Sequence, residues 1–145
     1  MPDTEPILWY AMRATYGRNQ EAKKRLDEKG VESFIPMRYV VTIDRKGRKV
    51  KKLVPVVRDL VFVRTDRSSM LLLKEQLEYL RNIYIPTEEG KKQPVVVRDA
   101  DMDNFIKAQE RYFFAVNERT PEKEQILRDG VQKVIDNFKN MVARR

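Results

Sequence analysis

The side chains with the clearest capacity for chemistry in this sequence are cations gathered in one short stretch. Six of the eight positions from 45 to 52 are basic: Arg45, Lys46, Arg48, Lys49, Lys51 and Lys52. Charges this close repel one another unless water or an anion surrounds them. One interpretation is contact with the phosphates of a nucleic acid. The other is a charged strand edge that discourages aggregation.

Catalytic chemistry finds little support in the sequence. The chain has no cysteine and no histidine, which excludes disulfides, thiol nucleophiles, zinc sites of the usual kind and imidazole acid–base catalysis. Its five glycines are isolated, so no phosphate-cradling loop is present. Asp99, Asp101 and Asp103 alternate, but the glycine and glutamate of an EF-hand are missing, and helix capping is the favoured role. We therefore expect a binding protein with no catalytic residue, no metal site and no cofactor.

Length and charge narrow the class of binding protein. The chain has 145 residues, which suits one domain, and its 30 basic against 22 acidic residues give a net charge of +8. A positive surplus favours polyanionic partners, although a merely soluble basic protein has the same composition. No apolar run approaches the roughly 20 residues of a membrane helix. The acidic N-terminus is not a signal peptide, so we expect a cytoplasmic protein without a membrane segment.

Two strands and a helix are expected to position the first basic residues. Residues 8–14 are rich in apolar and aromatic side chains, which suits a strand. Asn19 then predicts a helix N-cap, and Ala22 and Leu26 share one face of the helix. Lys29 and Gly30 predict its end, and residues 31–36 predict a second strand. The result is a strand–helix–strand unit.

The remaining elements predict an antiparallel sheet with helices against its faces. Residues 37–43 and 48–57, joined by a turn at 44–47, form a hairpin that carries the cations. Residues 60–64 lack polar alternation, which indicates a central strand covered on both faces. A helix is predicted over roughly 69–80, from the apolar spacing of its residues, and another begins at Asp99. Short strands are predicted at 83–85 and 95–97. The fold class is therefore α+β.

The end of the chain is expected to be separate from this domain. We place the domain at residues 1–116 and a linker with a helical tail at 117–145. Thr120 and Pro121 are typical of a helix start, and apolar residues then recur at helical spacing as far as Val142. An apolar stripe of this kind should pack on its own domain or on a second copy of the chain, which would give a homodimer.

The order of these residues resembles a known family. Trp9 and Tyr10 open a strand, a short basic helix follows, and Gly30, Val31, Phe34 and Pro36 return the chain. This arrangement looks like the N-terminal (NGN) domain of NusG-type transcription elongation factors. The family usually has a Pro-Gly-Tyr-Val-Phe-Val-like strand. Here Arg58 to Val63 stands in its place, and only the Val-Phe-Val half matches. Within the family the chain is most similar to the specialised UpxY-like antiterminators of Bacteroides-type bacteria.

The resemblance implies a partner and a set of contact residues. Members of the family dock an apolar patch on the clamp coiled coil of RNA polymerase, bridge the DNA of the elongation complex and suppress pausing or termination. By position, Leu60 and Phe62 would line that polymerase-binding patch, whereas Trp9 is expected in the core. Members normally continue into a small KOW barrel. About five residues follow the segment that resembles its start, so the barrel is absent or truncated in this chain.

An alternative from another class remains open. The chain would then be a small α+β RNA- or ribosome-binding module that uses the basic hairpin and the helix edge from Arg13 to Arg25. Under either hypothesis the residues assigned to nucleic acid are those of the hairpin and of this edge: Arg13, Arg18, Arg45, Lys46, Arg48 and Lys49.

Overall fold

The computed structural model describes residues 5–118, 129, 132–133 and 136. Its helices and strands are, in chain order, β1 (Leu8–Ala14), the 3-10 turn η1 (Thr15–Gly17), α1 (Asn19–Glu28), β2 (Glu32–Phe34), β3 (Met37–Ile43), β4 (Lys49–Pro55), β5 (Leu60–Thr65), α2 (Arg67–Gln76), β6 (Leu80–Asn82), β7 (Tyr84–Pro86), β8 (Lys92–Pro94), β9 (Val96–Val97) and α3 (Asp99–Glu118). The predicted α+β class with an antiparallel sheet is confirmed.

Strand β1 is the centre of the main sheet. The strand order is β2-β5-β1-β6, and every pairing is antiparallel. On the side away from β5, β6 pairs with Met12–Ala14 of β1, and β9 pairs with Trp9 and Tyr10. Because β5 lies between them, β1 and β2 run parallel without touching. The predicted strand–helix–strand unit is therefore present in its split form.

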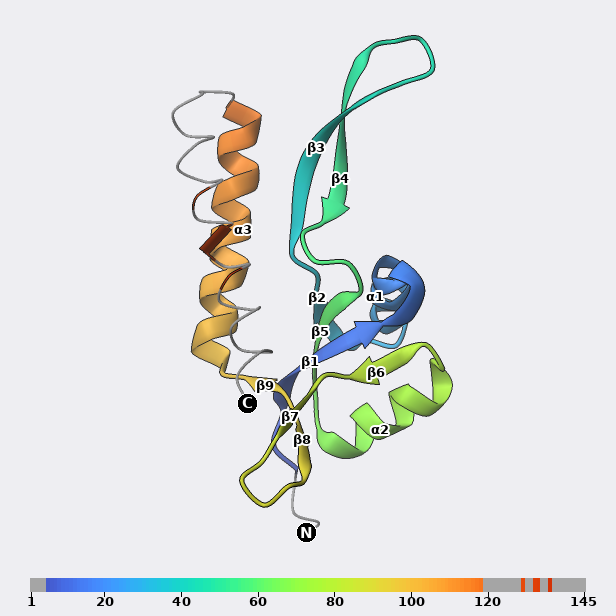
Figure 1. The fold of residues 1–145 in the computed structure, drawn as a ribbon, viewed down its shortest axis with the longest axis vertical. Coiled ribbons are helices and arrows are strands. Elements are labelled where there is room, and N and C mark those ends of the chain that lie inside the picture. The colour runs from blue at the N-terminus through green and yellow to red at the C-terminus, as the bar shows by residue number, and fades with distance from the viewer. Residues whose placement is uncertain (1–4, 119–128, 130–131, 134–135, 137–145) are drawn as a thin grey trace.

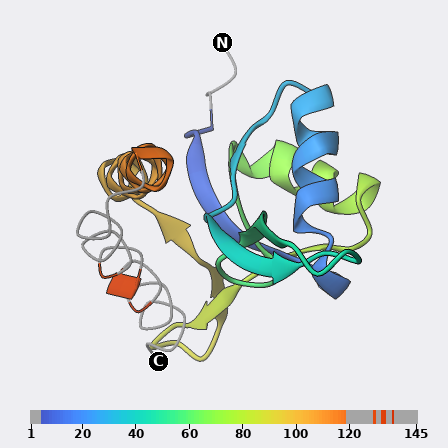
Figure 2. The same cartoon turned by 90° about the horizontal axis from the view of Figure 1, so that it is seen from above.

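Helices cover both faces of this sheet (Figure 2). Alternate side chains of β1 and β5 point to opposite faces. Tyr10, Met12, Val61 and Val63 pack in the cluster under α1 and α2. Trp9, Ala11, Leu60 and Phe62 pack in a second cluster with Met102 of α3. The expectation that β5 is covered on both faces is confirmed, and each fully buried side chain of this size contributes about 1.5–3 kcal/mol.

Helix α1 begins at Asn19, the residue that the sequence predicts to be its N-cap and therefore to precede the helix. Asn19 is the first helical residue, Arg18 stands at the N-cap position, and the exposed fraction of Asn19 is 1%. Its Nδ2 donates to the carbonyl oxygen of Leu60, at 3.1 Å. The predicted N-cap is therefore wrong. The buried amide satisfies a strand carbonyl, which ties α1 to the start of β5.

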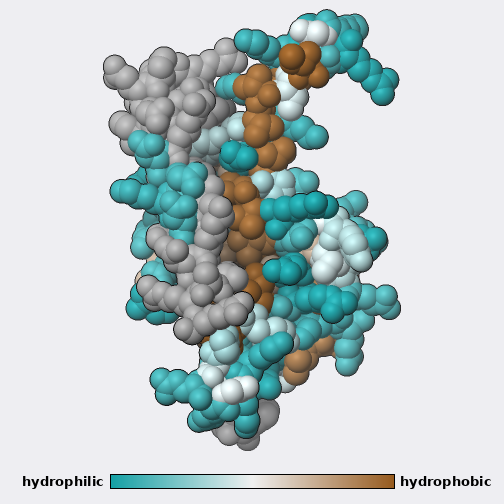
Figure 3. All heavy atoms as spheres, in the orientation of Figure 1, coloured by the Kyte–Doolittle hydropathy of each residue, from teal (hydrophilic) through white to brown (hydrophobic). Residues whose placement is uncertain are grey.

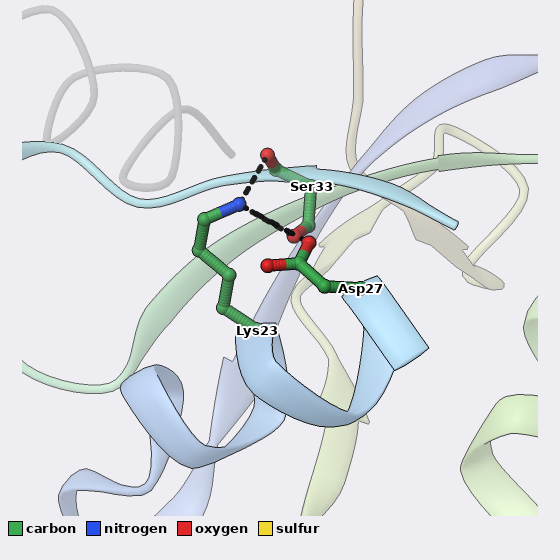
Figure 4. Close-up of polar contacts among 3 residues, drawn as sticks. All are labelled: Lys23, Asp27 and Ser33. Carbon is green, nitrogen blue, oxygen red and sulfur yellow. Dashed lines mark hydrogen bonds and ion pairs between the residues drawn. The ribbon is translucent and has the colours of Figure 1, made fainter. Parts of the chain in front are cut away.

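A lysine joins α1 to β2 (Figure 4). Lys23 Nζ donates to the carbonyl oxygen of Ser33 at 3.2 Å and lies 3.3 Å from its Oγ. The same ammonium group lies 3.4 Å from Asp27 Oδ1, one turn along the helix. Lys23 is one of the basic residues of α1, but its ammonium group is engaged by Ser33 and Asp27 within the domain.

Helix α2 is shorter than the predicted 69–80. Asp66 caps its start, where Oδ2 accepts from Ser69 N at 3.0 Å. The helix ends at Gln76, since Leu77 has an extended backbone, and Leu80 pairs with Ala14 in β6. Leu77 and Leu80 are both buried, as their apolar spacing indicates, but Leu77 lies in the turn after the helix and Leu80 lies in a strand. Pairing with β1 overrides helix periodicity here.

The basic hairpin is present as predicted and projects from the body beside α3 (Figure 1). Its register runs from Met37 opposite Pro55 to Ile43 opposite Lys49. Side chains of α3 hold its base. Gln109 Oε1 accepts from Met37 N at 2.6 Å, and the Tyr112 hydroxyl accepts from Tyr39 N at 3.0 Å. The Tyr39 ring also contacts Phe113 edge-on, with centroids 5.5 Å apart.

Helix α3 runs through the aromatic segment at 111–116 and ends at Glu118. Asn117 and Glu118 are therefore helical rather than part of a linker. Nearly all of the predicted linker and helical tail lies outside the described residues, and so does the predicted dimer contact through the tail.

Candidate nucleic-acid interface

The turn at the tip of the hairpin is built around one carboxylate. Asp44 Oδ1 accepts from the backbone N–H groups of Lys46, at 2.9 Å, and Arg48, at 2.8 Å. Its Oδ2 accepts from Arg48 Nε at 3.1 Å. Gly47 completes the turn with φ +76°, a conformation that favours glycine. The backbone hydrogen bond from Arg48 is the main reason why the pKa of Asp44 lies below its usual value.

These interactions divide the cations of the hairpin into two groups. Arg48 is paired with Asp44, whereas Arg45 and Lys46 are exposed at the tip with no ion pair in the described part of the chain. Lys49 and Lys51 lie opposite Ile43 and Val41, so they share one face of the ribbon with them. Lys52 lies opposite Val40, on the other face. The charge therefore surrounds the hairpin rather than forming one stripe.

The hairpin also exposes apolar side chains. Val41 is 65% exposed and Ile43 is 72% exposed. Figure 3 shows the apolar surface, in brown, continuing from the body onto the hairpin. A two-stranded ribbon with this mixture of cations and short β-branched side chains has dimensions that the major groove of DNA admits.

The other two basic residues assigned to nucleic acid have different surroundings. Arg18 precedes α1, and its guanidinium carbon lies 5.4 Å from the centroid of the Tyr79 ring, which is a cation–π arrangement. Arg13 is exposed on β1, directly opposite Arg81 of β6. The β3–β4 hairpin extends away from the sheet that holds β1 (Figure 1). The structure therefore does not gather the predicted nucleic-acid residues into one site.

Leu60 and Phe62 are not exposed. Leu60 is 6% exposed and Phe62 is fully buried, both in the cluster beneath α3. The expectation of an open apolar patch at these side chains is therefore corrected by the packing of the sheet. Trp9, expected in the core, is 3% exposed in the same cluster. A polymerase-binding role for Leu60 and Phe62 stays a prediction.

The turn before β5 keeps the backbone shape that a glycine would give. Asp59 stands where the resembled family has glycine, and its φ is +74°. Aspartate tolerates this left-handed region better than most residues. Its Oδ1 also accepts from the backbone N–H of Gly17 at 2.6 Å, and its carbonyl oxygen accepts from Ala14 N at 2.8 Å. These bonds hold the turn against the end of β1.

A surface cavity of about 550 Å³ lies beside β6 and the β7–β8 hairpin. Arg13 lines it together with residues that no sequence pattern marks as functional: Arg81, Asn82, Tyr84 and Lys92. The apolar spacing of the sequence predicts a helix as far as residue 80, so it gives no reason to place residues 81 and 82 beside Arg13. A strand predicted at residues 80–82 would have indicated this group, because a strand there that pairs with β1 places Arg81 opposite Arg13.

Other kinds of site find no support in the part of the chain that the structure describes. Residues 5–118 and the few beyond hold no group of three or more acidic side chains that could bind a metal ion. Asp99 and Asp101 lie instead near Arg64, at 3.8 Å, and Arg98, at 3.1 Å, respectively. None of the described helices is long and apolar enough to cross a membrane.

Comparison with models of known protein families gives a match over most of the chain. A family model described as "NusG: Transcription termination factor nusG" matches residues 8–106. The matched segment starts with β1 and ends inside α3, so it contains the whole main sheet and both hairpins. No curated protein matches the chain.

Proposed function

The chain belongs to the NusG family of transcription factors, and on that premise we propose that it binds RNA polymerase and regulates elongation or antitermination. The observation that carries the proposal is the family match over residues 8–106, which spans the sheet and the projecting basic hairpin. We further propose that the chain is one of the specialised UpxY-like antiterminators and acts in the cytoplasm. No covalent step and no cofactor is part of the proposal.

The proposed polymerase contact is the clamp coiled coil. The face of the sheet toward α3 is its proposed docking side, because Leu60 and Phe62 lie there in one apolar cluster with Trp9. Both side chains are buried, so a partner reaches them only when the cover of this face moves aside. Without such a movement, Leu60 and Phe62 do not contact the partner and only support the residues that form the docking surface.

The proposed DNA contact is the hairpin. Arg45, Lys46 and Lys49 are exposed, and Arg48 is held in place by Asp44. Cations on a projecting ribbon attract phosphates whatever the base sequence. A factor that holds polymerase with its body and DNA with its hairpin would stabilise the closed elongation complex, which suppresses pausing or termination.

A transcription assay tests this function. Purified chain is added to elongation complexes on a template with a strong pause and a terminator, and the paused and terminated fractions are measured. We expect both fractions to fall. In parallel, the chain is mixed with free RNA and with core polymerase. Binding to free RNA, with no binding to polymerase and no effect on pausing, would favour the RNA- or ribosome-binding alternative.

A further inference from the structure

Two arginines face each other on the α3 side of the main sheet. Arg13 of β1 and Arg81 of β6 are directly opposite in the register, so their side chains leave the same face from neighbouring strands. Trp9 and Ala11, at alternate positions before Arg13, lie in the cluster beneath α3, which identifies the face. Within the described residues neither guanidinium is part of an ion pair. Facing like charges destabilise a sheet, so the pair becomes favourable only when an anion joins it.

This pair lies at the edge of the proposed docking side. Arg13 is also opposite Leu60 of β5, so Arg81, Arg13 and Leu60 form one row across three strands. In the next row Phe62 and Ile83 lie on either side of β1. Both arginines are exposed, whereas Leu60 and Phe62 are buried. A partner that approaches this face therefore reaches the arginines without any movement of the domain.

The surroundings of the pair favour a carboxylate over a phosphate. Arginines beside apolar side chains such as Leu60 and Ile83 are typical of protein-binding surfaces, whereas surfaces that bind nucleic acid are much more strongly positive. The denser group of cations in this chain is on the β3–β4 hairpin. Guanidinium groups donate in a planar fork that fits a carboxylate with two parallel hydrogen bonds. Arg13 is among the residues predicted to contact nucleic acid, and its surroundings favour a different anion.

We propose that Arg13 and Arg81 bind carboxylates of an acidic segment of RNA polymerase at the exposed edge of the docking side. This inference rests on the proposed function and deepens it, because it adds an ionic contact to a surface whose apolar residues are buried. A surface that presents cations at this place would be rejected, since it would meet two unpaired positive charges. The pair therefore contributes to the choice of partner and makes the affinity for polymerase depend on salt.

The test measures the affinity of the labelled full chain for core polymerase over a series of salt concentrations. The variants are Arg13→Gln, Arg81→Gln and Arg13→Glu, and the matched control is Arg111→Gln, an exposed arginine on α3. Each glutamine variant should weaken polymerase binding about tenfold and reduce its salt dependence, because a charge-assisted hydrogen bond is lost. Arg13→Glu should weaken binding further, since like charges then repel each other. The control should keep the affinity and the salt dependence of the wild type.

A second measurement identifies the anion. In Arg13→Lys and Arg81→Lys a carbodiimide joins the introduced amine to a carboxylate in contact with it, whereas the native guanidinium does not react. These variants keep the charge and lose only the fork, so they should bind polymerase more tightly than the glutamine variants. Mass spectrometry of the cross-linked complex should find position 13 or 81 joined to an aspartate or glutamate of polymerase. Cross-links from the native lysines of the chain serve as the internal control.

Thermal unfolding separates this site from a structural role. Removal of one of two facing like charges should leave Tm unchanged or raise it. A lowered Tm in Arg13→Gln or Arg81→Gln would instead give that arginine a structural role and would count against the inference.

Three further results would overturn the inference. One is equal affinity for polymerase in the wild type and in both glutamine variants. Another is weaker binding of duplex DNA in these variants with unchanged affinity for polymerase, which would make the anion a phosphate. The third is the absence of cross-links from positions 13 and 81 in lysine variants that still bind polymerase. Failure of the wild-type chain to bind polymerase at all would reject the proposed function itself.

Discussion

At the scale of single residues, Leu60 is the side chain whose placement has the clearest consequence. It begins β5, packs with Trp9 and Phe62, and its carbonyl oxygen accepts from the buried Asn19. Leu60→Asp should therefore abolish or strongly weaken folding, because a charge at this position would be buried without a partner. Leu60→Ala should cost about 2–5 kcal/mol of unfolding free energy.

Thermal and urea unfolding of these variants provide the measurement. Leu72→Asp is the control, since Leu72 is 52% exposed on α2, and it should change Tm little. A Leu60→Asp protein with wild-type Tm that no longer binds polymerase would show that Leu60 lies in an open interface and not in the core.

Two tyrosine hydroxyls in different surroundings give a second prediction. The Tyr79 hydroxyl is buried with no partner among the described residues, and burial raises the pKa of its phenol. The Tyr112 hydroxyl accepts from the N–H of Tyr39. Tyr79→Phe should leave the free energy of unfolding unchanged or raise it, while Tyr112→Phe should lower it by about 1–3 kcal/mol, because an N–H loses its partner. Urea unfolding of the two variants side by side measures both free energies. A destabilised Tyr79→Phe variant would mean that the Tyr79 hydroxyl has a hydrogen-bond partner in the wild type.

At the scale of elements, the hairpin should behave as a separate charged arm. Replacement of Arg45, Lys46, Arg48 and Lys49 by glutamine should reduce the salt dependence of duplex DNA binding by a slope of about 0.9 for each phosphate that the hairpin no longer neutralises. Fluorescence anisotropy over a salt series measures this slope, and circular dichroism checks that the fold persists. An unchanged slope would contradict DNA contact and would favour the other interpretation, in which the hairpin is a solvated, charged strand edge that discourages aggregation.

The turn of the hairpin should loosen at low pH. The pKa of Asp44 is depressed in the folded chain, chiefly by the hydrogen bond from Arg48 N. The stabilisation is therefore present above the unfolded value and is lost as pH falls through the lower folded value. Amide NMR signals of Lys46 and Arg48 should shift together on acidification below 3.8, the ordinary pKa of the carboxyl, and Asp44→Asn should remove that titration. Titration at or above 3.8 in the wild type would contradict the depressed pKa.

Strong local patterns allow several elements to be predicted from sequence. The uniform apolar run of β5 indicates a strand covered on both faces, and the turn residues from Asp44 to Gly47 indicate the hairpin. The end of α2 could not be predicted, because Leu77 and Leu80 both satisfy helical spacing, yet Leu77 is extended and Leu80 pairs with Ala14 of β1. Strand β9 has only two residues, and its existence depends on the edge of β1.

The candidate site is less predictable than the fold. Sequence patterns identify cations and apolar strands, but they do not say which residues face each other across strands. Arg81 becomes notable only through its register with Arg13. The burial of Leu60 likewise depends on α3, which packs Met102 over the same face. Packing between elements far apart in the chain decides both cases.

At the scale of the whole molecule, the basic groups are distributed over separate surfaces. The hairpin extends from one end of the body, Arg18 lies against Tyr79, and the pair of Arg13 and Arg81 lies beside the β7–β8 hairpin. Such a distribution suits a protein that touches a large assembly at several points. The proposed polymerase contact is the one on which the others depend.

Affinity for polymerase with and without the tip of the clamp coiled coil tests that contact most directly. The labelled chain is titrated with core polymerase and with polymerase that lacks the tip, and both dissociation constants are measured at the same salt concentration. We expect binding to the complete enzyme and a large drop in affinity when the tip is removed. Equal affinity for the two enzymes, or no binding to either, would contradict it.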